Sequence, residues 1–140
     1  MTSHLHLPEG LRAQIREEAS TAFPNECCGL IEGAREGESV SVLALHPARN
    51  LATRSDRFEI DPAEQFRLMH ALQGTGRAIV GCYHSHPNGI AEPSAFDQEC
   101  ASGEGFVWLI AAVKATSKDA DISAFFFENR AFLPVVLTIA

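Results

Sequence analysis

The stretch AIVGCYHSHPNGIAEPSAFD, residues 78–97, places three possible metal ligands directly after a run of apolar residues. Residues 78–83 are nearly all apolar and predict a buried strand that delivers His84 and His86 at its end. Side chains at positions i and i+2 of an extended backbone point to the same side, so both imidazoles can reach one cation. Asp97 follows after ten residues and can close back as a third ligand. Two nitrogens and one carboxylate oxygen suit Zn²⁺ and leave a fourth position for water, which is typical of a catalytic site.

Each part of this pattern also has an interpretation without a metal. Two histidines on one face of a strand are more often exposed or hydrogen-bonded side chains than ligands. Ser94 follows Pro93 and precedes Asp97 by three positions, which is typical of a serine N-cap at the start of a helix. The capping interpretation is compatible with catalysis, because a helix start is a rigid support for a ligand and a hydroxyl group.

Spacing alone is not specific, because a similar pattern occurs near the N-terminus. His4 and His6 are followed by Glu17 at the offset of eleven residues that also separates the last two ligand candidates. This copy lacks the serine and the proline of the second stretch, and Gln14 stands where the capping serine would fall. We interpret it as a chance match.

The second stretch resembles the signature of the JAMM metalloproteases, the catalytically competent MPN domains. The matching positions are His-Ser-His-Pro at 84–87, Ser94-x-x-Asp97, Glu26 within NECCGL at 25–30, Asn50, and FEIDP at 58–62. The resemblance covers roughly residues 8–138, and every catalytic position of the signature is filled. It implies the MPN arrangement, which is related to the deaminase-like sandwiches.

The resemblance also implies a mechanism and a substrate. Zinc held by His84, His86 and Asp97 would activate water and polarise a carbonyl group. Glu26 would be the general acid/base, and the Ser94 hydroxyl would donate to the oxyanion. JAMM enzymes cut after the Gly-Gly tail of ubiquitin-like proteins, and the short connections here make the chain similar to small prokaryotic members that process sulfur carriers. The expected function is a zinc peptidase or isopeptidase that cleaves after the C-terminal Gly-Gly of such a partner.

Three other functions are weighed against this one. A deubiquitinase-like isopeptidase would use the same site on lysine-linked conjugates. A non-catalytic MPN scaffold would lack at least one of the four residues Glu26, His84, His86 and Asp97, and all four are present. A zinc-dependent nucleobase deaminase requires H-x-E and P-C-x-x-C motifs, which are absent.

Composition is consistent with one globular domain over residues 1–140, with 46% hydrophobic and 21% charged residues. The net charge of −7 and the lack of a basic run argue against nucleic acid as a partner. No run of 18 apolar residues and no secretory signal occurs, so we expect a cytoplasmic protein that does not span a membrane. Cys27 and Cys28 are adjacent, and we expect all four cysteines to be reduced. The role of this pair and the oligomeric state stay undecided.

Periodicity predicts an α/β fold, with one mixed sheet of about six strands and helices packed on its faces. Helices are expected at 8–22, from 61 to the glycines at 74 and 76, and at 94–102. Strands are expected at 28–32, 40–45, 78–83, 106–113, 122–127 and 132–139, with a brief one at 58–60 and polar turns at 34–39 and 114–121. Phe66, Met69 and Leu72 predict a buried stripe on the second helix. Pro134 predicts an edge or a bulge in the last strand, because proline cannot donate to a ladder.

Overall fold

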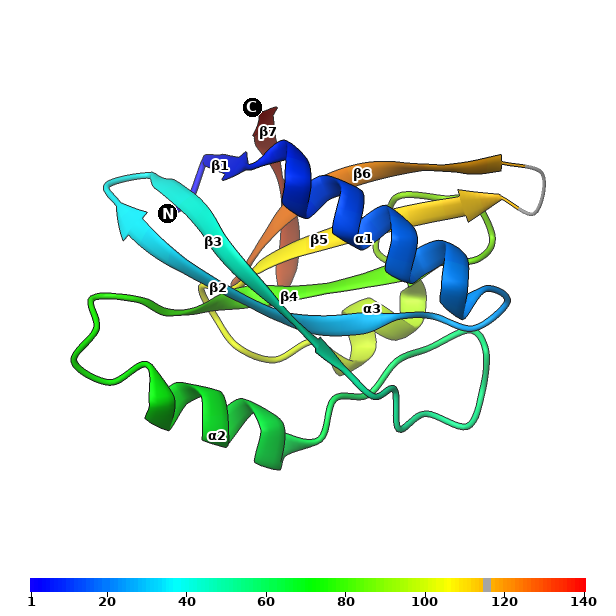
Figure 1. Cartoon of the computed structure of the whole chain (residues 1–140), viewed down its shortest axis with the longest axis horizontal. Coiled ribbons are helices and arrows are strands. Elements are labelled where there is room, and N and C mark those ends of the chain that lie inside the picture. The colour runs from blue at the N-terminus through cyan, green and yellow to red at the C-terminus, as the bar shows by residue number, and fades with distance from the viewer. Residues whose placement is uncertain (115–116) are drawn as a thin grey trace.

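The computed structural model describes residues 1–114 and 117–140, which form a mixed sheet of seven strands and three helices (Figure 1). The strands are β1 (His4–Leu7), β2 (Cys28–Glu36), β3 (Ser39–Ala48), β4 (Ala78–His86), β5 (Val107–Lys114), β6 (Ser117–Glu128) and β7 (Ala131–Ile139). The helices are α1 (Glu9–Ala22), α2 (Pro62–Ala71) and α3 (Ala95–Cys100). The sheet closes in the order β1-β3-β2-β4-β5-β6-β7. The predicted α/β class, with a mixed sheet and flanking helices, is confirmed.

β4 lies between β2 and β5 and carries the histidines to one end of the sheet. It pairs antiparallel with β2, where His84 lies opposite Cys28, and parallel with β5. The strand is buried from Val80 through His86. A side chain at Gly29 would overlap the ring of Tyr83, so glycine leaves room for that ring across the strand pair. The antiparallel pairing holds the start of β2 beside the end of β4.

The predicted first helix is confirmed as α1, which contacts β5 and β6 (Figure 1). Its apolar stripe buries Ile15 and Ala19 in the main core. The helix ends before Phe23-Pro24, since the residue before a proline is disfavoured in the helical region. None of the described helices is both long and apolar enough to cross a membrane.

β1 was not predicted, and it completes the closed sheet by pairing in parallel with β3 and β7. Its pairing with β7 starts only at Val136, so Pro134 faces β6 alone and has the expected edge environment. The polar turn predicted at 34–39 is much shorter, because β2 and β3 extend until only Gly37 and Glu38 connect them. Gly37 permits this tight turn with its φ of +61°.

The brief strand predicted at 58–60 is wrong. Phe58 and Ile60 instead pack, without strand pairing, against a second apolar cluster that contains Trp108. The polar turn predicted at 114–121 is too long, because β5 runs to Lys114 and β6 already begins at Ser117. Residues 115 and 116, which also belong to this prediction, lie outside the described residues.

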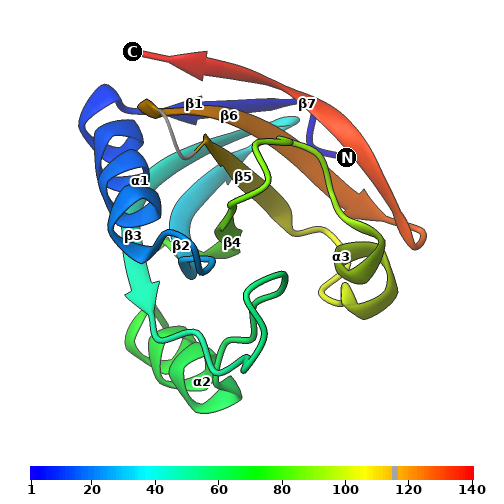
Figure 2. The same cartoon turned by 90° about the vertical axis from the view of Figure 1, so that its right-hand side faces the viewer.

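The buried stripe predicted on α2 is also wrong. The helix begins as expected, with Asp61 as N-cap and a first-turn proline. However, no side chain of α2 is buried, and Phe66 and Met69 are 66% and 52% exposed. Figure 2 shows α2 to one side of the closed sheet, with no other described helix or strand on its far side.

Candidate active site

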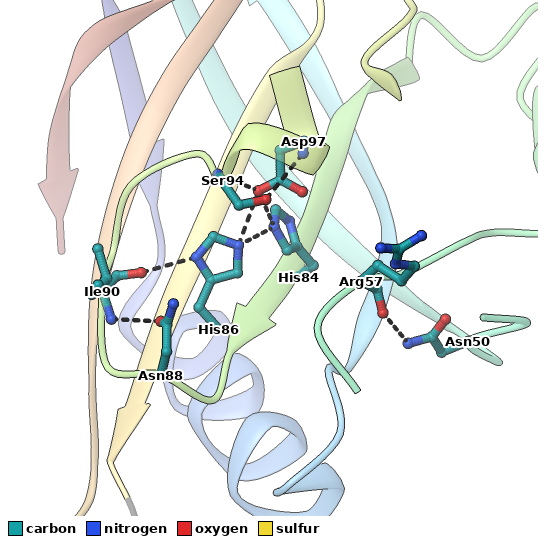
Figure 3. A network of polar contacts seen from close by, with 8 residues as sticks. All are labelled: Asn50, Arg57, His84, His86, Asn88, Ile90, Ser94 and Asp97. Carbon is teal, nitrogen blue, oxygen red and sulfur yellow. Dashed lines mark hydrogen bonds and ion pairs between the residues drawn. The ribbon is translucent and has the colours of Figure 1, made fainter. Parts of the chain in front are cut away.

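The end of β4 and the start of α3 bring together His84, His86 and Asp97 (Figure 3). The two Nε2 atoms of the histidines lie 2.9 Å apart. Asp97 Oδ2 lies 3.1 Å from Nε2 of His84 and 3.0 Å from Nε2 of His86. All three side chains are buried. The three predicted ligand atoms therefore converge on one point inside the protein.

The N-terminus of α3 holds Asp97 in this place. Ser94 is the N-cap, and its Oγ accepts a hydrogen bond from the backbone N–H of Asp97 at 3.0 Å. In return, the backbone N–H of Ser94 donates to Asp97 Oδ2 at 2.9 Å. This reciprocal capping box fixes the same oxygen that faces the histidines. Ser94 and Asp97 thus form the N-cap of α3, and Asp97 contacts the two histidines at the same time.

Glu26 lies at the junction of α1 and β2, as expected, and reaches the same cluster. One donor atom each from Glu26, His84 and His86 lies within 4.8 Å of the others. The Glu26 side chain is buried, and no described residue offers a hydrogen bond to its Oε1. Burial raises the pKa of Glu26 to about 8. A buried carboxyl oxygen without a partner is costly, so this position indicates a site rather than a packing role.

The electrostatics favour an ionised aspartate among nitrogen donors. Burial opposes the charge of Asp97, but the hydrogen-bonding contacts with His84 and His86 hold its pKa well below the usual range. Burial lowers the pKa of His84. For His86, burial acts in the same direction, but the contacts with Asp97 and the Ile90 carbonyl prevail and raise its pKa.

Residues 8–127 match the family described as prokaryotic homologs of the JAB domain. The chain belongs to this family. It is similar to a protein of Haloferax volcanii named desampylase, with 37% identity over 73% of each chain. It is also 35% identical to a probable TtuB-protein conjugate cleaving protease of Thermus thermophilus, over 66% of this chain and 60% of that protein. A solution structure of a Desulfitobacterium hafniense protein superposes with a TM-score of 0.86 and 27% identity, covering 97% of this chain and 92% of that one. The membership confirms the resemblance seen in the sequence.

The donor set of this JAB domain suits a zinc ion. Ligand atoms about 2.0–2.1 Å from a tetrahedral zinc lie roughly 3.3 Å from one another. The observed separations between the donors of His84, His86 and Asp97, from 2.9 to 3.1 Å, are close to that value. A nitrogen-rich set with a single carboxylate also favours zinc over calcium or magnesium.

The histidine rings are oriented by partners that the sequence pattern did not reveal. His86 Nδ1 lies 2.9 Å from the Ile90 carbonyl, a contact that fixes which ring nitrogen faces the cluster. The ring of Phe58 stacks on His84 with centroids 4.3 Å apart, and Trp108 meets the same ring edge-on at 5.5 Å. Phe58 belongs to the FEIDP segment that matches the JAMM signature, and this match is the sequence feature that points to a role for Phe58 in the site.

The cysteines beside Glu26 are poor nucleophiles. Burial raises the pKa of Cys27 to about 11 and that of Cys28 to about 12, so both are thiols at neutral pH. Cys28 lies in β2 and is buried, whereas Cys27 is half-buried just before the strand. This JAB domain therefore has no activated thiol at this position.

Two hollows lie beside the cluster, one next to Asp97 and one next to Glu26. A cavity of about 530 Å³ flanks Asp97, and its walls include Phe58, Ile60 and Trp108. A groove of about 470 Å³ flanks Glu26 and runs along α1.

Proposed function

We propose that this JAB domain is a zinc-dependent peptidase or isopeptidase that cleaves after the C-terminal Gly-Gly of a small ubiquitin-like or sulfur-carrier protein. The observation that carries the proposal is the buried convergence of His84, His86 and Asp97 within 3.1 Å, beside the Glu26 carboxyl group. The names of the desampylase and conjugate-cleaving relatives support a protein-conjugate substrate. The likeness to small prokaryotic JAMM enzymes supports the Gly-Gly tail and the sulfur carrier.

In this proposal, Nε2 of both histidines and Oδ2 of Asp97 hold the zinc ion. When bound, zinc would act as a Lewis acid that activates water and polarises the scissile carbonyl group. Glu26 accepts a proton from the attacking water and passes it to the departing amine. Burial raises the pKa of Glu26, which makes its carboxylate a stronger proton acceptor. The Ser94 hydroxyl accepts from the backbone of α3, so its own hydrogen is available to the oxyanion.

A glycine-ended tail suits the depth of this site. The donor atoms are buried at the end of β4, so the scissile bond must come close to the protein backbone. Glycine permits this approach because it has no side chain and few conformational restrictions. The two hollows beside Asp97 and Glu26 are lined by side chains that can hold the chain before and after the bond.

We further propose that residues 1–140 form one JAB domain that acts in the cytoplasm. The match over residues 8–127 supports the first part. Four free cysteines support a reducing compartment.

The decisive experiment offers two substrates in parallel with zinc present. One is a sulfur carrier extended beyond its Gly-Gly, and the other is a lysine-linked ubiquitin dimer, with products measured by mass spectrometry. We expect the carrier to be trimmed to a Gly-Gly terminus while the dimer persists, and we expect chelation of zinc to stop the reaction. Brisk cutting of the dimer beside an untouched carrier would favour the deubiquitinase-like function. A rate that survives complete removal of metal would overturn the zinc mechanism.

A further inference from the structure

The peptide group that joins Glu26 to Cys27 is held at both ends by side chains from two other parts of the chain. The carbonyl oxygen of Glu26 accepts a hydrogen bond from Asn50 Nδ2 at 3.0 Å. The N–H of Cys27 donates to Ser85 Oγ at 2.8 Å. Because a peptide group is planar, fixing both ends fixes the plane itself. We call this arrangement the Glu26–Cys27 clamp.

Ser85 connects the clamp to the two histidines. It lies between His84 and His86 in β4, so its side chain points to the opposite face of the strand. The side chain is buried, and the backbone N–H of Ser85 also donates to the carbonyl oxygen of Cys27 at 3.1 Å. The strand that presents the histidines thus holds Cys27 through both backbone polar groups.

Asn50 connects the clamp to the loop on the other side. Its Oδ1 accepts from the backbone N–H groups of Ala52 at 2.9 Å and Glu59 at 3.0 Å. Its Nδ2 donates to the carbonyl of Arg57 at 3.1 Å (Figure 3). The same Nδ2 also donates to the carbonyl of Glu26. The amide thus uses its full capacity of two donors and two accepted bonds on backbone groups. One side chain thereby shapes the loop and ties it to Glu26.

The same loop covers the site. Phe58 stacks on His84, and the guanidinium of Arg57 lies 3.9 Å from the ring centroid of Phe96 in α3. A loop held by Asn50 therefore touches both the ligand strand and the helix that carries Asp97.

Glu26 needs such support, because it lies before the β2 ladder and its Oε1 has no hydrogen-bond partner among the described residues. The β2 ladder begins only at Cys28, two residues further on. Its carboxyl group is therefore aimed mainly by its own backbone.

We propose that Ser85 and Asn50 are positioning residues, which hold the Glu26–Cys27 peptide so that the Glu26 carboxyl group meets the histidine pair. This inference rests on the proposed role of Glu26 as general acid/base. A displacement of about 1 Å at such a group costs on the order of 10² in rate. Neither residue needs to touch the substrate to have this effect.

The test uses Ser85→Ala and Asn50→Ala, singly and together, in the wild-type and in a Glu26→Gln background. Thr53→Ala is the matched control, since Thr53 is an exposed residue of the same loop. In the wild-type background we expect kcat to fall roughly 10- to 100-fold with KM and zinc content nearly unchanged. The double variant should lose little more than the worse single one, because both side chains hold one peptide group. In the Glu26→Gln background the same changes should cost almost nothing further.

A second measurement needs neither metal nor substrate. In zinc-free protein, hydrogen exchange at the Cys27 amide should become about tenfold faster in Ser85→Ala and stay unchanged in Thr53→Ala. Asn50→Asp keeps the oxygen that shapes the loop but cannot donate to Glu26 when ionised, so it should match Asn50→Ala in rate while remaining folded.

Two outcomes would overturn the positioning role of Ser85 and Asn50. One is a wild-type kcat in Ser85→Ala and Asn50→Ala while Glu26→Gln is impaired. The other is an equal further loss in the Glu26→Gln background, which would indicate general structural damage. Full activity of Glu26→Gln would be a different result, because it would show that Glu26 is not the general acid/base of the proposed mechanism.

Discussion

β1 and β4 each carry a His-x-His sequence, and the two strands use it in opposite ways. In β1 (residues 4–6) both histidines are exposed, and Leu5 between them is buried in the core. In β4 (residues 84–86) both histidines are buried, and so is Ser85 between them. The His-x-His spacing and the type of element are the same, but the middle residue is leucine in β1 and serine in β4. What covers the outer face of each strand decides whether its histidine pair is buried.

The difference arises from what lies over the outer face of each strand. The outer face of β1 meets solvent, so its histidines remain outside while leucines fill the interior. The outer face of β4 is covered by Phe58, by Trp108 of the next strand and by Asp97 of α3. Burial beside a carboxylate gives the β4 pair the environment in which histidine nitrogens bind a metal.

Removing each histidine pair in turn should give the largest contrast. We expect His84→Ala/His86→Ala to lose bound zinc and activity completely, because two of three ligands disappear. The matched variant His4→Ala/His6→Ala should keep one zinc per chain and the wild-type rate. Elemental analysis of both proteins measures this directly, and metal retained in the first variant would refute the site.

Lowering the pH should empty the β4 site without any substitution. Ligands must be deprotonated to bind metal, and His86 has a raised pKa, so it gains a proton first as the pH falls. His84, with a lowered pKa, and Asp97, whose pKa is far below the usual range, stay unprotonated longer. Zinc affinity should therefore weaken as the pH falls through the histidine range, which titration with a competing chelator measures. A pH-independent affinity would mean that His86 is not a ligand.

Glu26→Gln separates the proton-transfer group from the metal ligands. We expect zinc and fold to be retained and the rate to fall by about 10²–10⁴, the usual scale of general acid/base catalysis. Glu36→Gln is the control, because Glu36 ends the same strand β2 in an exposed position. Single-turnover rates at saturating zinc provide the measurement. A wild-type rate in Glu26→Gln would show that another group moves the proton.

Ser94→Ala and Ser3→Ala compare the hydroxyl groups beside the two histidine regions. Ser3 lies just before β1, and its Oγ is 2.9 Å from Nδ1 of the exposed His4. We expect Ser94→Ala to lose on the order of 10²–10³ in kcat through the oxyanion contact. Loss of the N-cap should also lower its stability by about 1 kcal/mol. Ser3→Ala should change neither quantity, and equal kinetics for the two variants would remove Ser94 from the mechanism.

Most of the site residues that the sequence predicts are set by short-range spacing, whereas Glu26 is indicated only by the family resemblance. His84, His86, Ser94 and Asp97 lie within one strand, one turn and one helix start, and the structure brings their side chains together. For Phe58 the sequence pattern predicts a strand, whereas the structure has its ring stacked on His84, a residue far away in the sequence. Contacts of that kind leave no periodic signal in the chain.

The fold shows the same limit. β1 has only four residues and closes the sheet between β3 and β7. Its place depends on strands far away in the sequence, so no local pattern reveals it. Both α1 and α2 carry apolar residues at spacings typical of a helix, yet α1 buries Ile15 and Ala19 whereas α2 buries no side chain. Periodicity indicates which face of a helix is apolar, but not whether anything covers it.

The smallest expected effect lies on the uncovered helix. The Phe66 side chain is largely exposed, so truncation removes little buried area and leaves no cavity. Alanine is also the better helix former, which offsets much of the remaining loss. We therefore expect Phe66→Ala to change the free energy of unfolding by less than about 0.5 kcal/mol. Ile15→Ala, on the covered stripe of α1, should cost about 2–5 kcal/mol because it opens a cavity in the core. Denaturant unfolding of the two variants under identical conditions compares them. A loss above about 2 kcal/mol for Phe66→Ala would mean that α2 packs against the sheet in solution and that its stripe is buried after all.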